Sequence, residues 1–380
     1  AQGFDGPVSI LAGIDARVAN TNVRNYVGTG KTHLTDAVFS ETDDNIVLCD
    51  VQTNQSHVRI AVAVRTEFDG TDAKPRDPES GDGRHQRQFN LHLVDGERVT
   101  TTKTAALATS RDAAISSPGV AVLEELGRNG GGFDALLDGH EAAWRRLWDR
   151  FGITLDADRQ SQLILNLHVF HVLQAISEHT MTLDAGVTAR GLNGEGYRGH
   201  VFWDELFVMP VIGSRLPQVS RALLEYRWQR LDAARAAARE QGLKGALFPW
   251  QSGSDGREET PRWIYNTRSA RWMPDNSSRQ RHVGLAVAYN AWQHFQATGD
   301  RDWLAARGAQ LIIEVTRMFA SLATFDAGAN RYHLDGVMGP DEFHDGYPAA
   351  PGEGLTDNAY TNVLLSWVCD RASEVMTELA

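Results

Sequence analysis

The stretch Thr188-Ala-Arg-Gly-Leu-Asn-Gly-Glu-Gly-Tyr-Arg-Gly-His-Val-Phe-Trp-Asp204 is the most informative part of this chain. Four glycines in it permit positive φ and close approach of a ligand: Gly191, Gly194, Gly196 and Gly199. The Trp203-Asp204 pair that ends it offers an apolar ring face for C–H groups and a charged acceptor for hydroxyls, as a sugar pocket requires. The competing interpretation, which is the commoner one for such a stretch alone, is a plain loop whose Trp packs and whose Asp caps a helix.

Upstream of this stretch, residues 1 to about 125 have the period of β-strands. Apolar residues alternate with smaller or charged ones in 57–65 and again in 89–93, and Asp95-Gly96 is a turn signal before a Thr-rich strand that begins at Val99. Several short strands at this spacing predict an antiparallel β-sandwich.

From Phe133 onward the pattern is helical. The predicted helices are 133–151, 158–180, 203–212, 217–241, 279–298, 301–322 and 358–379. Two long connections, 242–278 and 323–357, separate some of them, and connections of that length are usually functional. A run of helices with Trp, Asp and Glu in its loops suggests an all-α toroid with a site at one end.

The bulk properties exclude several classes of function. The formal charge of −12 over 380 residues, without a basic run, argues against nucleic-acid binding. No apolar run is long enough to cross a membrane and no signal pattern is visible, so a cytoplasmic location is expected. Cys49 and Cys369 are expected to be buried thiols. His168 and His171 lack a partner carboxylate at ligand spacing, so we assign no metal, and the absence of nucleotide-binding motifs argues against nucleotide cofactors.

A second informative segment is Val337-Met-Gly-Pro-Asp-Glu-Phe-His-Asp345. Its adjacent carboxylates Asp341 and Glu342 lie in a loop that Pro340 stiffens. Neighbouring negative charge and partial burial raise a carboxyl pKa, as a general acid requires, and glycoside cleavage needs one such acid. The alternative is a charged turn before a helix.

A third cluster surrounds Trp250 and Gln251, which again pair an apolar platform with a polar group. For Trp263 and Trp272 we expect packing under the long loop instead. His282, at the start of the following helix, either faces a pocket or is a structural histidine. Asp357 and Asn358, near the last helix, serve either a site or a helix N-cap.

Together these segments resemble glycoside hydrolase family 65, the inverting phosphorylases and hydrolases of α-glucosidic disaccharides such as maltose, trehalose and kojibiose. The 189–204 stretch is similar to the family signature that precedes its glucose-binding Trp-Asp. Further family blocks follow in the same order: Phe248-Pro-Trp-Gln-Ser252, Gln280-Arg-His-Val283, Gly339-Pro-Asp-Glu342 and Asn358-Ala-Tyr-Thr-Asn362. The likeness runs from about residue 140 to the end and is weaker through the strands.

The resemblance implies a multidomain β plus α fold. Residues 1–127 would form part of an N-terminal β-sandwich, 128–157 a helical linker, and 158–380 the N-terminal part of an (α/α)6 barrel catalytic domain.

The resemblance also implies residue roles. Glu342 would be the general acid, and Trp203 and Asp204 would hold the transferred glucose. The remaining substrate-binding residues would be Trp250, Gln251, His282 and Asp341, although the family often has Glu at position 251.

The function implied is inverting cleavage of an α-glucosidic disaccharide, with phosphorolysis to β-glucose 1-phosphate as the leading hypothesis. The alternatives are an inverting α-glucosidase that uses water, or a truncated sugar-binding barrel without catalysis. No cofactor is expected beyond inorganic phosphate as co-substrate. In the family the residues that serve the nucleophile lie beyond position 380, so we expect an excerpt of a longer polypeptide or a complementing second chain, and the family suggests a homodimer.

Overall fold

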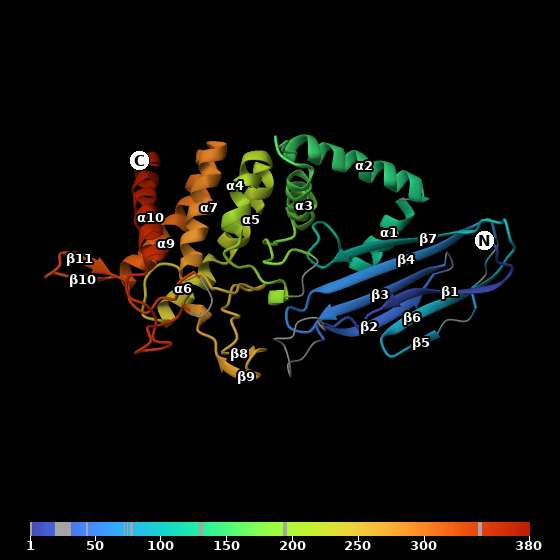
Figure 1. Cartoon of the computed structure of the whole chain (residues 1–380), viewed down its shortest axis with the longest axis horizontal. Coiled ribbons are helices and arrows are strands. Elements are labelled where there is room, and N and C mark those ends of the chain that lie inside the picture. Colours follow the sequence, from blue (N-terminus) through green and yellow to red (C-terminus); the bar gives the residue numbers. More distant parts are fainter. Residues whose placement is uncertain are drawn as a thin grey trace. The chain divides into compact units, whose positions relative to one another are not determined.

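The computed structural model describes residues 2–19, 32–42, 45–71, 73, 75–76, 79–128, 132–192, 196–340 and 344–380. They form two compact units, one of the described residues up to Asp149 and one of Arg150–Ala380. The first unit holds strands and the second is mainly helical (Figure 1). This order of β then α elements confirms the mixed fold class predicted from the sequence.

The first unit contains two antiparallel sheets. The larger has the strand order β2-β3-β4-β7: β2 (Leu34–Glu41), β3 (Ile46–Thr53), β4 (Arg59–Asp69) and β7 (Thr100–Thr109). The smaller has the order β1-β6-β5: β1 (Gly6–Asp15), β6 (Arg84–Leu93) and β5 (Glu79–Gly81). The predicted strands 57–65 and 89–93 correspond to β4 and to the end of β6, and the Thr-rich segment is β7.

The two sheets contact each other through apolar and ionic pairs. Phe68 of β4 and Phe89 of β6 lie with ring centroids 4.8 Å apart. Glu41 of β2 accepts hydrogen bonds from Arg87 Nε at 3.0 Å and pairs with His85 Nε2 at 2.5 Å, both on β6. The Arg87 guanidinium, followed by the His85 ring, lowers the pKa of Glu41 to about 2 although partial burial opposes this. An ionised Glu41 therefore links the sheets.

A helix that the sequence pattern did not reveal covers the larger sheet. In α1 (Pro118–Arg128), Val122 and Leu126 pack on Ala61 and Ala63 of β4. The small side chains on the strand let the helix approach closely, and the buried cluster extends to the alanines of β7. The next helix, α2 (Gly132–Phe151), agrees with the predicted 133–151.

The second unit is built from helices: α3 (Arg159–Ala175), α4 (Glu205–Arg215), α5 (Pro217–Gln229), α6 (Leu231–Glu240), α7 (His282–Thr298), α8 (Arg301–Trp303), α9 (Ala309–Leu322) and α10 (Ala359–Glu378). The predicted helix 217–241 is divided at Arg230, and a π-helical turn, Leu304–Gly308, joins α8 to α9. The long connections contain two hairpins: β8 (Trp263–Asn266) with β9 (Arg271–Pro274), and β10 (Thr324–Asp326) with β11 (Arg331–His333).

Helix α7 is the centre of this unit. It packs against α4 on one side and α10 on the other, while α5 and α9 also contact it (Figure 1). Most of its residues are buried on all faces, as expected for a helix enclosed by neighbours. No helix in the described part of the chain is long and apolar enough to cross a membrane.

Three expectations about single side chains were wrong. Trp263 and Trp272 do not pack under the loop, because they lie on the β8–β9 hairpin and are 56% and 49% exposed. Cys49 is buried as expected, but Cys369 is exposed on α10. Aromatic and thiol residues are buried on average, but a short hairpin or the outer face of a helix offers them no covering layer.

Candidate functional site

The candidate site begins with two loops that pair through their backbones. Val201 and Ser252 exchange two hydrogen bonds, each with an N–O distance of 3.0 Å. The Tyr226 hydroxyl fixes the second loop by donating to Gly253 O at 2.7 Å. This pairing brings together the segments that carry Trp203 and Trp250, which are 47 positions apart in the sequence.

Aromatic rings from two helix starts and one loop meet at this point. Trp203 precedes α4, and His282 is the first residue of α7. The Trp203 and His282 ring centroids are 4.7 Å apart, and Trp250 lies 5.2 Å from His282 and 6.4 Å from Trp203. The structure therefore brings together three of the predicted site residues.

Tyr360, on the first turn of α10, belongs to the same aromatic group and was not predicted. Its ring lies edge-on to Trp203 at 5.7 Å and to His282 at 5.8 Å. Tyr360 lies in the Asn358–Asn362 block of the family resemblance, and its place in that block was the signal that could have identified it. Asn358 itself is an N-cap, because its Oδ1 accepts from Thr361 N at 3.1 Å.

Asp204 occupies the N-cap position of α4, yet its side chain makes no capping hydrogen bond. It is half-buried, and burial raises the pKa of its carboxyl group, while a hydrogen bond from its own backbone N–H and the charge of Arg190 oppose the rise. The interpretation of Trp203-Asp204 as packing plus a helix cap therefore fails for the aspartate. Its carboxylate oxygens are suited to accept hydrogen bonds from a ligand's hydroxyl groups.

A buried ion pair fixes the start of α4. Arg227 of α5 donates through Nε to Glu205 Oε2 at 2.9 Å and through Nη2 to Phe202 O at 2.7 Å. Both side chains are 3% exposed or less. The pair holds the backbone on either side of Trp203 and Asp204. A single sequence could not reveal it, because the partners are 22 positions apart on different helices.

The loop with Trp250 and Gln251 is held from both ends. Gly245 has φ +74°, and a Cβ there would lie 2.2 Å from Glu314 O of α9, so the position requires glycine. At the other end the Glu258 carboxylate accepts from Trp250 N at 2.8 Å and Gln251 N at 3.2 Å. Gln251 is 5% exposed, so its side chain is buried beside Trp250 in the sequence.

His282 is fully buried and its ring is neutral. Both ring nitrogens lack a hydrogen-bond partner among the described residues. Burial lowers the pKa of His282 to about 4. A buried polar group without a partner costs free energy, which is expected where a ligand supplies the missing hydrogen bond.

The predicted acid Glu342 and its neighbour Asp341 lie outside the described residues. Their flanking residues are described: Met338 N donates to Arg279 O at 3.0 Å, and Gly339 N donates to His344 O at 3.0 Å. Met338 is thus bonded to the backbone three residues before His282.

The glycine-rich stretch adopts left-handed backbone as predicted, but only partly at its glycines. Gly191 and Gly199 have positive φ, while Gly194 lies outside the described residues. Tyr197 and Arg198 also have positive φ, 61° and 54°. Such conformations are costly for residues with a Cβ and cluster at functional sites. Among the residues that the structure describes, no group of three or more His, Cys, Asp or Glu is placed to hold a metal.

Comparison with known proteins identifies the class to which this fold and site belong. Residues 166–380 match the glycosyl hydrolase family 65 central catalytic domain, and residues 1–147 match the N-terminal domain of the same family. The chain is a member of glycoside hydrolase family 65.

Several relatives cover nearly the whole chain. An uncharacterized glycosyl hydrolase of Mycobacterium tuberculosis is 46% identical over 99% of this chain and 28% of its own length. The trehalose 6-phosphate phosphorylase of Lactococcus lactis is 38% identical over 95% of this chain and 46% of its own. The kojibiose phosphorylase of Halothermothrix orenii is 30% identical over 99% of this chain and 48% of its own length. The chain thus spans less than half the length of each of these relatives.

A solved structure shares the fold. A putative kojibiose phosphorylase from the human microbiome superposes with a TM-score of 0.79 at 18% identity, covering 98% of this chain and 45% of that one.

Proposed function

We propose that this chain forms the glucose-binding part of an inverting enzyme that cleaves α-glucosidic disaccharides with phosphate, releasing β-glucose 1-phosphate. The observation that carries the proposal is the cluster of Trp203, Trp250, Tyr360 and neutral His282. Next to Trp203 in the chain is Asp204, whose carboxylate makes no helix-capping hydrogen bond. Apolar ring faces with a few convergent polar groups are the usual composition of a sugar site. The relatives named above as phosphorylases support the choice of phosphate as co-substrate.

The proposal includes the architecture implied by the resemblance. Residues 1–127 belong to an N-terminal β-sandwich, 128–157 to a helical linker and 158–380 to an (α/α)6 barrel. In this arrangement α4, α7 and α10 are inner helices whose N-termini surround the sugar, and α5 and α9 belong to the outer layer. The packing of α7 between α4 and α10 supports it. A cytoplasmic location stays a prediction.

The proposed chemistry is a single displacement. Glu342 donates its proton to the glycosidic oxygen as the bond to the anomeric carbon breaks, and a phosphate oxygen attacks that carbon from the opposite face. The configuration inverts, and the products are β-glucose 1-phosphate and the second sugar. The hydrogen bond from Met338 N to Arg279 O, three residues before His282, supports the choice of this segment as the source of the acid.

In this proposal the apolar and the polar side chains contact different parts of the glucose molecule. Trp203 and Trp250 contact the C–H faces of glucose, and Asp204 accepts hydrogen bonds from its hydroxyls. His282 is neutral at physiological pH, so one ring nitrogen donates and the other accepts. Gln251 and Asp341 complete the set of substrate-binding residues.

The test is to incubate the complete enzyme to which this chain belongs with maltose, trehalose or kojibiose, with and without inorganic phosphate, and to assay glucose 1-phosphate and free glucose. Phosphate-dependent glucose 1-phosphate is the expected product. Free glucose formed equally without phosphate would establish the hydrolase instead.

Glu342→Gln tests the acid. It should reduce turnover by at least about a hundredfold, the usual contribution of a general acid. Glu353→Gln, an exposed carboxylate in the same long loop, is the matched control and should remain active. Near-full activity of a folded Glu342→Gln variant would refute the assignment.

A further inference from the structure

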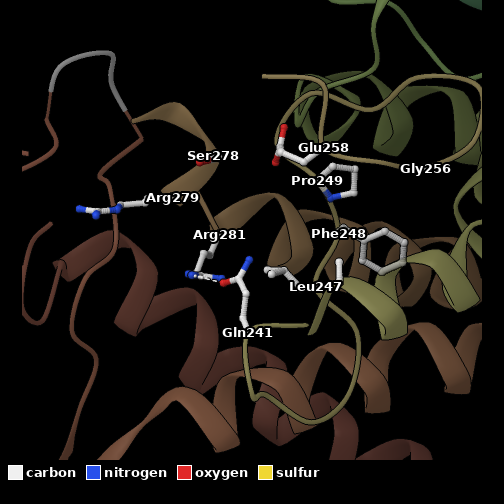
Figure 2. Close-up of a pocket in the computed structure, with 10 residues that line it drawn as sticks. Gln241, Leu247, Phe248, Pro249, Gly256, Glu258, Ser278, Arg279 and Arg281 are labelled. Atoms are coloured by element: carbon white, nitrogen blue, oxygen red, sulfur yellow. Dashed lines mark hydrogen bonds between the residues drawn. The ribbon is translucent and has the colours of Figure 1, made fainter. Parts of the chain in front are cut away.

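A polar cavity is lined in part by residues of the loop that carries Trp250. It has a volume of about 280 Å³. Its lining includes Gln241, Pro249, Glu258, Ser278 and Arg281 (Figure 2). The cavity is therefore adjacent in sequence to both Trp250 and His282, but it is lined by different side chains from the aromatic cluster.

The guanidinium of Arg281 is only partly bonded. Its Nη2 donates to Gln241 Oε1 at 2.8 Å. Its Nε and Nη1 are buried and have no partner among the described residues. Because Arg281 occupies the amide oxygen of Gln241, the amide nitrogen is left as the donor of that side chain. Unpaired buried N–H groups of a cation are costly unless a ligand binds them.

Glu258, the carboxylate that lines the cavity, is not ion-paired with Arg281. The Glu258 carboxylate is engaged by its own loop, accepting from Trp250 N at 2.8 Å and Thr260 Oγ1 at 2.7 Å. Figure 2 shows the end of the Arg279 side chain directed away from Gln241 and Arg281, and it donates to Gly352 O. Burial lowers the pKa of Arg281, and Arg279 lowers it further by more than Glu258 raises it.

The position of Arg281 at the start of a helix adds partial positive charge to the charge of its guanidinium. Arg281 is the N-cap residue of α7, which runs for 17 residues, and makes no side-chain cap bond. The N-terminus of such a helix carries partial positive charge and favours anions. The available donors are a guanidinium edge, an amide nitrogen and the Ser278 hydroxyl, and this combination matches the several acceptor oxygens of a tetrahedral oxoanion.

We propose that this cavity binds a phosphate group, with Arg281 as its main ligand and Gln241 and Ser278 as additional donors. The group comes either from inorganic phosphate or from a phosphate monoester. The site is distinct from the glucose pocket, and the inference does not rest on the proposed catalytic function.

Calorimetric titration of the chain at constant ionic strength tests the proposal. The ligands are inorganic phosphate and, separately, glycerol 3-phosphate. Arg281→Met should weaken phosphate binding at least about tenfold, since a charge-assisted hydrogen-bond pair is lost. Arg281→Lys keeps the charge but not the forked geometry, so its affinity for phosphate should lie between that of the unmodified chain and that of Arg281→Met. Arg271→Met, on the exposed strand β9, is the matched control and should bind like the unmodified chain.

The two ligands distinguish the source of the phosphate group. Tighter binding of glycerol 3-phosphate assigns the site to esters, and tighter binding of inorganic phosphate assigns it to the free ion. Lack of phosphate binding by the chain, or equal affinity in folded Arg281→Met or Arg281→Lys variants, would overturn the proposal. Glucose affinity measured on the same samples reports on the aromatic pocket, so failure of the two sites is separable.

Discussion

Replacing Arg227 by methionine should destabilise the helical unit more than almost any other single change at a charged residue. The substitution removes the donor to Glu205 Oε2 at 2.9 Å and the donor to Phe202 O at 2.7 Å. It leaves Glu205, whose side chain is 3% exposed, as a buried charge without its partner. Methionine fills a similar volume, so the expected loss comes mainly from electrostatics and hydrogen bonding.

The magnitude follows from the burial of both partners. Breaking a buried pair by removing one partner costs about 3–5 kcal/mol. Loss of the hydrogen bond to Phe202 O is part of that cost, since a bond from a charged group contributes about 1.5–3 kcal/mol. We therefore expect a decrease of about 4 kcal/mol in the free energy of unfolding. Urea unfolding followed by tryptophan fluorescence measures it.

Two further variants separate this mechanism from a general effect of losing arginine. Arg317→Met breaks an ion pair with Glu314 at an N–O distance of 2.9 Å, where the Arg317 side chain is 58% exposed. It should cost about 0.5 kcal/mol or less. Adding Glu205→Leu to Arg227→Met removes the stranded charge and should recover part of the loss. A loss below about 1 kcal/mol for Arg227→Met alone would refute the reasoning.

Two more predictions concern stability. Glu41→Gln removes an acceptor whose pKa, about 2, lies below its unfolded value of 4.5, so the native carboxylate stabilises the fold above about pH 4.5 and this contribution disappears as the pH falls toward 2. The variant should be less stable at pH 7 but lose less stability on acidification, as denaturation curves at pH 7 and pH 3 would show; parallel loss in both proteins would contradict it. Gly245→Ala places a Cβ 2.2 Å from Glu314 O at φ +74°. It should lower the free energy of unfolding, measured by thermal denaturation, by about 2 kcal/mol or more. Gly139→Ala, inside α2 with nothing near its Cβ, is the control and should cause no loss.

The sequence predicted the strands and helices whose apolar residues recur with a regular spacing. The β4, β6 and β7 strands and most of the helices follow from alternation and from helical spacing, because these patterns arise within a few residues. Helix α1 was missed although Ser117-Pro118 is a helix-start signal, because its few apolar residues were assigned to the preceding strands.

The candidate site was predicted through motifs, but its geometry depends on contacts between distant residues. Trp203, Trp250 and His282 converge because Val201 pairs with Ser252 and because α4 packs on α7. The Glu205–Arg227 pair joins residues on different helices, so no local pattern marks it. The burial that keeps His282 neutral likewise arises only when the helices assemble.

The most direct test of the glucose pocket is calorimetric titration of glucose into the chain and into Asp204→Asn. The unmodified chain should bind glucose, and Asp204→Asn should bind at least about tenfold more weakly because an ionic acceptor becomes a neutral amide. Asp232→Asn, a carboxylate whose side chain is 93% exposed on α6, should bind like the unmodified chain. Equal glucose affinity in all three folded proteins, or no glucose binding by any of them, would contradict the assignment of the pocket.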